Sequence, residues 1–420
     1  MIVDSRQGFQ GDSSRRLRAD VWRLQNILRR DPALDGDADR LREFASLTWA
    51  CLDRSGLLTS LVKNIDPSAI ELASDFLTSR ISLQTIKSEA LDVVGRLLKN
   101  ASVSTVGDVY EAILGDLSAA GNYGEFYTPR LLTRTLATVA TMQRPDEVVD
   151  PACGTGGFLL SALSTGLVGA VVGVEKKPLP FSLCVANLAL HEAAVPCSVV
   201  LGNGIEFLAS REASIDAIVT NPPFGASEDE KVRRIFGKGL SSSETVDLFI
   251  VGCVRSLREG GMAAIVVPDG PLYGTNVRRR IREYVFESSA RLTILRLPSQ
   301  VFAPYTLIKT NVIIIEKGSG ASGAWFYSLP PAEESQRYPL SPRELTAFTD
   351  WYAAPTENGH AWFEDTGTLE RNELRLDRVH PEKLMARRTL DFDYSRVDSV
   401  QSDISASHNA VESWIRENLS

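Results

Sequence analysis

The sequence predicts an α/β protein with a doubly wound, mostly parallel, seven-stranded sheet and a helical N-terminal domain. Two observations support this fold class. From residue 147 onward, short β-branched apolar runs alternate with longer amphipathic runs, as is typical of a parallel sheet with helices on both faces. Before residue 100, apolar residues recur only at helical spacing, so we expect helices without strands there.

The helical patterns of the N-terminal part lie in residues 17–28, 41–51 and 82–98. A glycine- and serine-rich stretch at 318–323 separates the strand-rich middle from a C-terminal part with more turn signals and charged residues. We therefore expect three regions. These are a helical domain over residues 1–115, an α/β domain over 116–320, and a region of helices and loops over 321–420.

Each expected strand is a short apolar run, and most are followed by a helical pattern. The seven strands are expected at 148–150, 170–174, 198–201, 215–220, 262–267, 292–297 and 312–315. The helices between them are expected at 158–163, 179–191, 247–257 and 278–286. Only a loop joins the last two strands, so we expect an antiparallel pair at one edge of the sheet.

The composition is that of an ordinary globular protein, with 44% apolar and 23% charged residues among 420. No apolar run reaches the roughly 18 residues that span a bilayer. The first residues lack an apolar segment of secretory type, so we expect a cytoplasmic protein with no membrane contact. The five cysteines show neither close pairing nor metal spacing with histidine. We expect buried, reduced thiols and no metal site.

The first expected strand runs into a glycine-rich turn, Asp150-Pro-Ala-Cys-Gly-Thr-Gly-Gly-Phe158. In doubly wound sheets, ligands bind beyond the carboxyl ends of the strands. Glycines at 154, 156 and 157 allow a tight turn and close approach of the backbone to a ligand. Asp150 can accept a hydrogen bond from an ammonium group or from a bound water. The turn is neither a dinucleotide fingerprint nor a P-loop. It suggests a nucleoside-bearing cofactor, although glycines that only turn the chain remain an alternative.

Two further polar residues follow the second and third expected strands. Glu175 ends the second, and its two acceptor oxygens match the vicinal hydroxyls of a ribose. Asn203 follows the third, where its amide could read an adenine ring. A surface glutamate and a plain Asn-Gly turn are the respective alternatives, and both stay open at this point.

The fourth expected strand is followed by Asn221-Pro222-Pro223-Phe224. The two prolines fix φ and remove backbone donors, so the carbonyls there stay free to accept. The Asn221 side-chain oxygen and the Pro222 carbonyl can each accept one proton of an amino group, which aims the nitrogen lone pair at an electrophile. Phe224 offers a face on which a flipped base can stack, worth about 1–3 kcal/mol.

This loop predicts methylation of an exocyclic amine on a base lifted out of DNA. Three alternatives remain open. The amine could be cytosine N4 rather than adenine N6, or the acceptor could be a protein glutamine. The chain could also be a regulatory scaffold that binds the cofactor without turnover.

Together, these motifs resemble the modification subunit of type I restriction–modification systems, within the N6-adenine DNA methyltransferase superfamily. The resemblance extends over roughly residues 121–318. The matching segments are Gly124–Arg130, Asp150–Leu159, Asn187–His191, Asn221–Gly225, Asp247–Phe249, Gly260–Gly270 and Leu297–Lys317.

The resemblance implies the class I S-adenosylmethionine-dependent methyltransferase fold for residues 116–320, and methyl transfer to adenine N6 in DNA. It implies catalytic roles for Asn221, Pro222, Pro223 and Phe224. It implies contacts with S-adenosylmethionine by Phe126, Tyr127, Thr128, Asp150, Ala152, Gly154, Thr155, Gly156, Gly157, Phe158, Glu175, Lys176, Asn203 and Gly204. Two positions depart from the family pattern. Residue 203 is often aspartate in the family, and residue 176 is often apolar.

The resemblance also implies partners. Such subunits act on duplex DNA with a separate specificity subunit, typically two modification chains to one, and a restriction subunit can join them. The net charge of −8 agrees with this, because a protein that grips DNA alone usually carries a basic excess. Basic clusters at 231–234 and 278–282 are candidate phosphate contacts, and solvated helix faces are the alternative. Residues 321–420 are a candidate partner-binding region.

Overall fold

The computed structural model describes residues 23, 26–27, 37–78, 92–93, 128–302, 308–330 and 340–381. The chain divides into two compact units, Met1–Asp377 and Arg378–Ser420. All helices and strands given below belong to the first unit.

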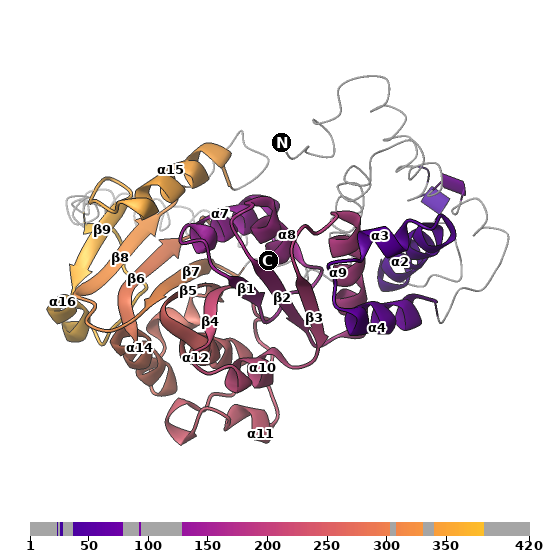
Figure 1. Cartoon of the computed structure of the whole chain (residues 1–420). Coiled ribbons are helices and arrows are strands. Elements are labelled where there is room, and N and C mark those ends of the chain that lie inside the picture. Colours follow the sequence, from indigo (N-terminus) through magenta and orange to yellow (C-terminus); the bar gives the residue numbers. More distant parts are fainter. Residues whose placement is uncertain are drawn as a thin grey trace, which may run out of the picture. The chain divides into compact units, whose positions relative to one another are not determined.

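A nine-stranded sheet forms the centre of this unit (Figure 1). Its strands are β1 Glu147–Asp150, β2 Ala170–Glu175, β3 Cys197–Leu201, β4 Ile215–Thr220, β5 Leu257–Pro268, β6 Ser289–Arg296, β7 Thr310–Lys317, β8 Gly323–Ser328 and β9 Ala361–Asp365. Their order is β3-β2-β1-β4-β5-β7-β6-β8-β9. The strands from β3 to β5 are parallel, and β7 is antiparallel to both of its neighbours.

All seven expected strands form, but the expected count of seven is wrong. β6 and β7 make the expected antiparallel pair. They do not lie at the edge, because β8 pairs in parallel with β6 and β9 pairs with β8. Residues 321–420 were expected to hold only helices and loops, yet both extra strands lie there. The sheet therefore continues across residue 320, and the division into domains stays a prediction.

The two extra strands are held by aromatic residues that their sequence presents on alternate faces. Phe326 of β8 stacks on Trp362 of β9 with ring centroids 5.2 Å apart. On the opposite face, Trp325 and Tyr327 pack against Trp351, at 5.7 and 4.9 Å between centroids. Buried aromatic pairs of this kind contribute beyond their area burial, by about 0.5–1.5 kcal/mol each.

Helices cover both faces of the sheet. Those before the sheet are α2 Asp37–Arg54, α3 Leu58–Leu61 and α4 Pro67–Thr78, which confirms the helical expectation for this part. The others are α7 Arg130–Thr141, α8 Gly157–Ser164, α9 Pro178–Leu190, α10 Gly204–Ser210, α11 Glu230–Arg233, α12 Thr245–Ser256, α13 Gly270–Tyr273, α14 Val277–Glu287, α15 Pro342–Ala353 and α16 Thr366–Arg371. Most of the pattern at 82–98 lies outside the described residues.

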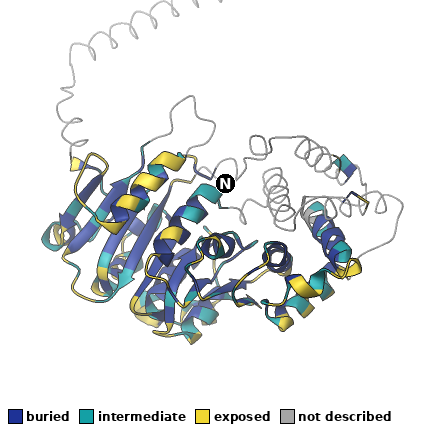
Figure 2. Ribbon diagram, turned by 45° about the horizontal axis from the view of Figure 1, so that its top comes forward, coloured by how far each residue is buried: buried dark blue, intermediate teal, exposed yellow. Residues whose placement is uncertain are grey.

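The central strand β5 shows why the sheet needs two helical layers. Its residues Met262, Ala264 and Val266 join a core cluster with residues of α7, α8, α9 and α15. The alternate residues 263, 265 and 267 join a second cluster with residues of α10, α12 and α14. Side chains alternate between the faces of a strand, so a strand that is apolar at every position must be covered on both sides. Figure 2 shows the strands buried and the outer helix faces exposed. The doubly wound α/β class is confirmed.

The N-terminal helices join the sheet at its β3 edge. α4 packs against α9. The segment before α4 also pairs with the first residue of β3: the Cys197 amide donates to the Asn64 carbonyl at 2.7 Å, and the Asp66 amide donates to the Cys197 carbonyl at 2.9 Å. These bonds satisfy backbone groups that an edge strand would otherwise leave unpaired.

All five cysteines are free thiols, and four of them are buried, as expected. Within the described ranges, no helix combines the length and apolar character needed to cross a bilayer.

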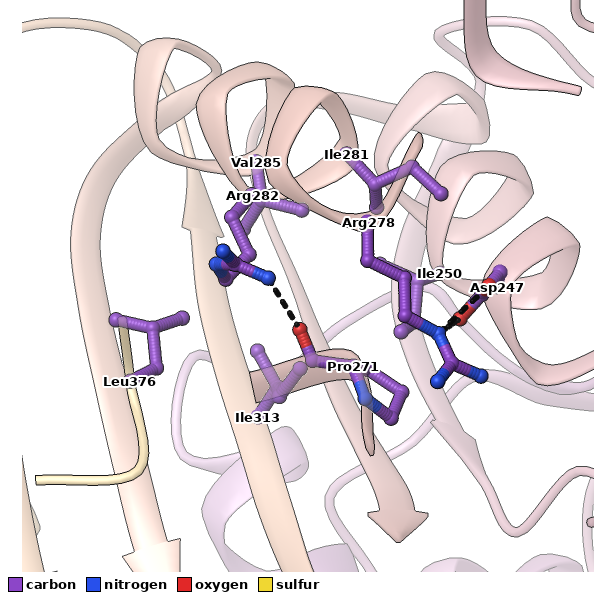
Figure 3. A pocket seen from close by; sticks show the side chains of 9 residues that line it. All are labelled: Asp247, Ile250, Pro271, Arg278, Ile281, Arg282, Val285, Ile313 and Leu376. Carbon is purple, nitrogen blue, oxygen red and sulfur yellow. Dashed lines mark hydrogen bonds and ion pairs between the residues drawn. The ribbon is translucent and has the colours of Figure 1, made fainter. Parts of the chain in front are cut away.

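The arginines of α14 form ion pairs and hydrogen bonds with other groups of the protein. A small pocket beside this helix is lined by Asp247, Arg278 and Arg282, among others (Figure 3). Arg278 forms an ion pair with the buried Asp247 at 3.0 Å. Arg279 pairs with Glu283, also at 3.0 Å. These contacts support the structural alternative to phosphate binding for this cluster.

Arg282 ties α14 to a distant part of the chain. It is only 4% exposed. Its guanidinium donates to four backbone carbonyls, those of Pro271 at 3.1 Å, Gly274 at 2.7 Å, Glu373 at 3.3 Å and Leu374 at 2.9 Å. A planar group with five donors in fixed directions can satisfy several carbonyls in this way, which a lysine cannot.

We expect Arg282→Leu to lower the free energy of unfolding by roughly 2–4 kcal/mol, because it leaves buried carbonyls without a charged donor. Arg280→Leu is the matched control, since Arg280 is exposed and, among the residues that the structure describes, its guanidinium donates to a single carbonyl, that of Gly239. It should cost less than about 0.5 kcal/mol. Urea unfolding of the two variants measures the difference, and equal losses would contradict this role of Arg282.

Candidate active site

The candidate site lies where the order of the strands reverses. β2 and β3 follow β1 in one direction across the sheet, whereas β4 and β5 extend in the other. β1 and β4 are parallel neighbours, so their carboxyl ends meet at the same edge. Asp150 ends β1 and Asn221 directly follows β4. Such a switch point leaves a crevice between the diverging loops, where ligands bind in open α/β sheets.

The glycine turn after β1 has a backbone that requires its glycines. Gly156 caps α8 with a φ of +89°. A Cβ there would lie 2.8 Å from the Cys184 sulfur, so both the conformation and the space exclude a side chain. Two neighbours fix the turn from outside: Arg130 donates to the Gly157 carbonyl and Asn187 donates to the Thr155 carbonyl, both at 3.0 Å.

Glu175 connects the end of β2 to the same turn. Its Oε2 accepts from the Gly154 amide at 3.1 Å, and its Oε1 accepts from the Lys177 amide at 2.7 Å. Burial raises the pKa of this carboxyl, and the two backbone donors oppose that rise. Each carboxylate oxygen can accept more than one bond, so Glu175 retains acceptor capacity while it holds the loop.

Asp150 is a buried carboxyl at the base of the crevice, with 1% of its surface exposed. The Ala152 amide donates to its Oδ1 at 3.1 Å. Burial raises its pKa to about 7, with Glu175 adding to the rise and the Ala152 amide opposing it. A carboxyl that titrates near neutrality inside a crevice is a recognised mark of a functional site.

A pocket opens between the glycine turn and Asn221. It is lined by Thr128, Arg130, Asp150, Ala152, Cys153, Gly154, Thr155, Gly157, Phe158 and Asn221. Eight of these ten were predicted site residues. Arg130 and Cys153 had no predicted role, although Arg130 ends one of the segments that carried the family resemblance. Phe126 and Tyr127 lie outside the described residues.

Only one of the two polar atoms of the Asn221 side chain has a hydrogen-bond partner among the described residues. Its Nδ2 donates to the Thr128 hydroxyl at 3.1 Å. Its Oδ1 is buried and has no hydrogen-bond partner among the residues that the structure describes. Leaving a buried acceptor unpaired costs about 1–3 kcal/mol, so few such groups occur in native proteins without a functional reason. A donor on a ligand in the pocket would satisfy it.

The rest of the Asn-Pro-Pro-Phe loop is less enclosed. Pro222 is buried and Pro223 is exposed. Phe224 is half-buried and packs against both core clusters, so the core fixes its ring while part of it stays accessible. None of these three lines the pocket described above.

A second group of predicted residues gathers beside this pocket. Asn203 caps α10, with its Oδ1 accepting from the Ile205 amide at 2.9 Å. Asn203 Nδ2 and Lys176 Nζ both reach Oε2 of Glu228, at 3.1 and 3.0 Å. Sequence reasoning did not single out Glu228, since no motif surrounds it.

Gly204 places this second group against the glycine turn. A Cβ on Gly204 would lie 1.9 Å from the Pro151 carbonyl oxygen, so the start of α10 touches the turn directly. The predicted residues thus form two adjoining groups, one around the pocket and one around Glu228.

We expect Gly204→Ala to force the backbone of the two segments apart and to cost about 1–3 kcal/mol, as overpacking does. Gly239→Ala is the control, because a Cβ at Gly239 would meet nothing within 4 Å. Urea unfolding distinguishes them. A Gly204→Ala protein as stable as the control would mean that the close approach is not required.

Comparisons with known proteins show which family this chain resembles. The N-6 DNA methylase family model matches residues 101–379. The type I restriction enzyme EcoEI methylase subunit of Escherichia coli is 37% identical over 300 residues, which cover 66% of this chain and 61% of that protein. The chain therefore spans less than two-thirds of the length of that curated relative.

Two solved structures are similar. A modification subunit of a putative type I restriction enzyme from Vibrio vulnificus YJ016 superimposes with a TM-score of 0.71 at 25% identity, covering 90% of this chain and 99% of that one. A putative class I S-adenosylmethionine-dependent methyltransferase from Listeria monocytogenes gives 0.53 at 17% identity, covering 74% and 98%. The latter shows the fold alone and confirms its predicted class. With the family model matching well over half of its residues, the chain belongs to the N-6 DNA methylase family.

Proposed function

We propose that this chain is the modification subunit of a type I restriction–modification system, which methylates N6 of adenine in duplex DNA using S-adenosylmethionine. The observation that carries the proposal is the unpaired, buried Oδ1 of Asn221 beside the pocket at the strand switch point. An amino group is the kind of donor that this oxygen lacks.

The residues around the pocket fit the proposed cofactor. Asp150 lines the pocket, and in its ionised form it would hold the ammonium of the methionine part. Glu175 has one backbone donor on each oxygen and can accept further bonds from the ribose hydroxyls. Gly154 and Gly157 line the pocket and have no side chain that could fill it. When bound, the cofactor would supply a methyl group on a sulfonium, which is already a good leaving group.

Asn221 and Pro222 would orient the adenine. The bond from Asn221 Nδ2 to Thr128 fixes the amide so that Oδ1 remains available to N6. Neither Pro222 nor Pro223 has a backbone N–H, so neither residue can donate to the Pro222 carbonyl and compete with N6 for it. The base must leave the duplex, at a cost of a few kcal/mol. Holding two reactants in attack geometry can contribute about 7–11 kcal/mol. The product can then lose its proton to water.

The charge of the chain supports a role for partners. The net charge is −8, and the described arginines of α14 contact protein groups. A separate specificity subunit would then supply much of the affinity for DNA. The complex would hold two modification chains and one specificity chain, and a restriction subunit would be a further partner. The place of action would be the cytoplasm, where the DNA lies.

Asn221→Ala should abolish methylation while leaving cofactor binding nearly intact, because the variant removes only the acceptor for N6. Asn372→Ala, the same truncation at the end of α16, should keep full activity. Each variant is co-expressed with the proposed specificity subunit, and transfer from radiolabelled cofactor to DNA and to protein is measured. Methylated DNA from the Asn221→Ala complex would refute the assignment, and label in protein alone would change the substrate.

Cofactor affinity should depend on pH through Asp150. Its pKa is raised to about 7, so the carboxyl is neutral below that pH and ionised above it. If the ionised form holds the ammonium, affinity for S-adenosylhomocysteine should be about tenfold weaker at pH 6 than at pH 8. Asp150→Asn should bind weakly at both values. Calorimetry across this range tests it, and a flat profile for the wild type would rule out this role of Asp150.

A further inference from the structure

Glu228 lies on the segment that leaves the catalytic loop, four residues after Phe224. That segment is anchored at its middle. The Thr245 amide donates to the Ala226 carbonyl at 3.0 Å, and Ser227 forms an antiparallel bridge with Glu244. The position of Glu228 is thus tied both to the Asn-Pro-Pro-Phe loop and to the start of α12.

The side chain of Glu228 turns inward, with 9% of its surface exposed. Two elements reach it, because Lys176 follows β2 and Asn203 caps α10. Both bonds fall on Oε2. Oε1 has no hydrogen-bond or ion-pair partner among the described residues. Lys176 and Asn203 thus hold one oxygen of this largely enclosed carboxylate and leave the other, Oε1, free to accept from a donor on a ligand.

Asn203 is poorly placed to accept a hydrogen bond from a ligand. Its Oδ1 already accepts from the Ile205 amide, and its Nδ2 is directed at Glu228. Asn203, which was expected to contact the amino group of a purine, therefore orients Glu228 instead. The strong acceptor at this end of the crevice is the carboxylate of Glu228, which reaches in from another part of the chain.

We propose that Glu228 determines the specificity for adenine in the cofactor, with Oε1 accepting a hydrogen bond from the adenine amino group. Lys176 and Asn203 are positioning residues that hold Oε2. This rests on the proposed function, since it requires S-adenosylmethionine as cofactor. It assigns the adenine end of the cofactor to the Glu228 group and the methionine end to the pocket around Asp150.

The test compares two ligands by calorimetry with the full chain. They are S-adenosylhomocysteine and S-inosylhomocysteine, in which a carbonyl oxygen replaces the amino group. The wild type should prefer the adenine ligand by roughly ten- to a hundredfold, as expected for a bond to a charged acceptor. Glu228→Gln can donate to the carbonyl, so its preference should fall to about one or reverse. The ratio within one variant cancels any general loss of folded protein.

Glu230→Gln is the matched control. Glu230 lies two residues further on, is exposed and pairs with Arg234, so the wild-type preference should persist. Lys176→Met should reduce the preference without reversing it, because it removes only a support. A Glu228→Gln protein that keeps the wild-type ratio would overturn the proposal for Glu228 alone. A wild type that binds neither ligand would overturn the proposed function as well.

Discussion

The parallel pairing of β1 with β4 is the constraint on which the site depends. It brings the ends of two strands, about 70 positions apart in the sequence, to one edge of the sheet. One end carries the glycine turn and Asp150, and the other carries Asn221. Because both strands are buried on both faces by the two helical layers, a shift in their register would cost much of the core. The relative position of the two loops is therefore fixed by packing rather than by the loops themselves.

Short polar bonds then set the details at this edge. Glu175 holds the glycine turn from β2, and Thr128 holds the amide of Asn221. In both cases a side chain that could bind a ligand is first oriented by the protein. Orientation before binding reduces the conformational entropy that these protein side chains lose when a ligand binds, which is a usual basis of catalytic positioning. Under the proposed function, the unpaired Oδ1 of Asn221 is the acceptor that this orientation leaves for the substrate.

The central strands could be predicted because they are short, mostly apolar and rich in β-branched residues, a pattern that indicates burial. β8 and β9 were missed for the opposite reason. Their aromatic residues are consecutive, with small and polar residues at the strand ends, and turn-forming residues precede them, so they resembled a loop region. Their stability comes from cross-strand ring contacts such as Phe326 with Trp362, which a single sequence does not reveal.

The site shows the same division. Asp150 and Glu175 end strands and Asn221 directly follows one. Because these strands are parallel neighbours in the sheet, the strand pattern of the sequence predicts that the three residues lie at the same edge. Glu228 follows a loop, and its contacts with Lys176 and Asn203 depend on how that loop folds back. Arg130 acts through a bond to the Gly157 carbonyl 27 positions away. Such long-range contacts have no local signal, and only the folded chain places them.

The proposed function requires that the Asn-Pro-Pro-Phe loop after β4 binds the amino group of a flipped adenine. The most direct measurement is a structure of the chain with its specificity subunit, target DNA and S-adenosylhomocysteine. We expect N6 of the flipped adenine at hydrogen-bond distance, about 3 Å, from both Asn221 Oδ1 and the Pro222 carbonyl. An adenine bound elsewhere, or an Asn221 Oδ1 occupied by a donor of the protein itself in that complex, would contradict it.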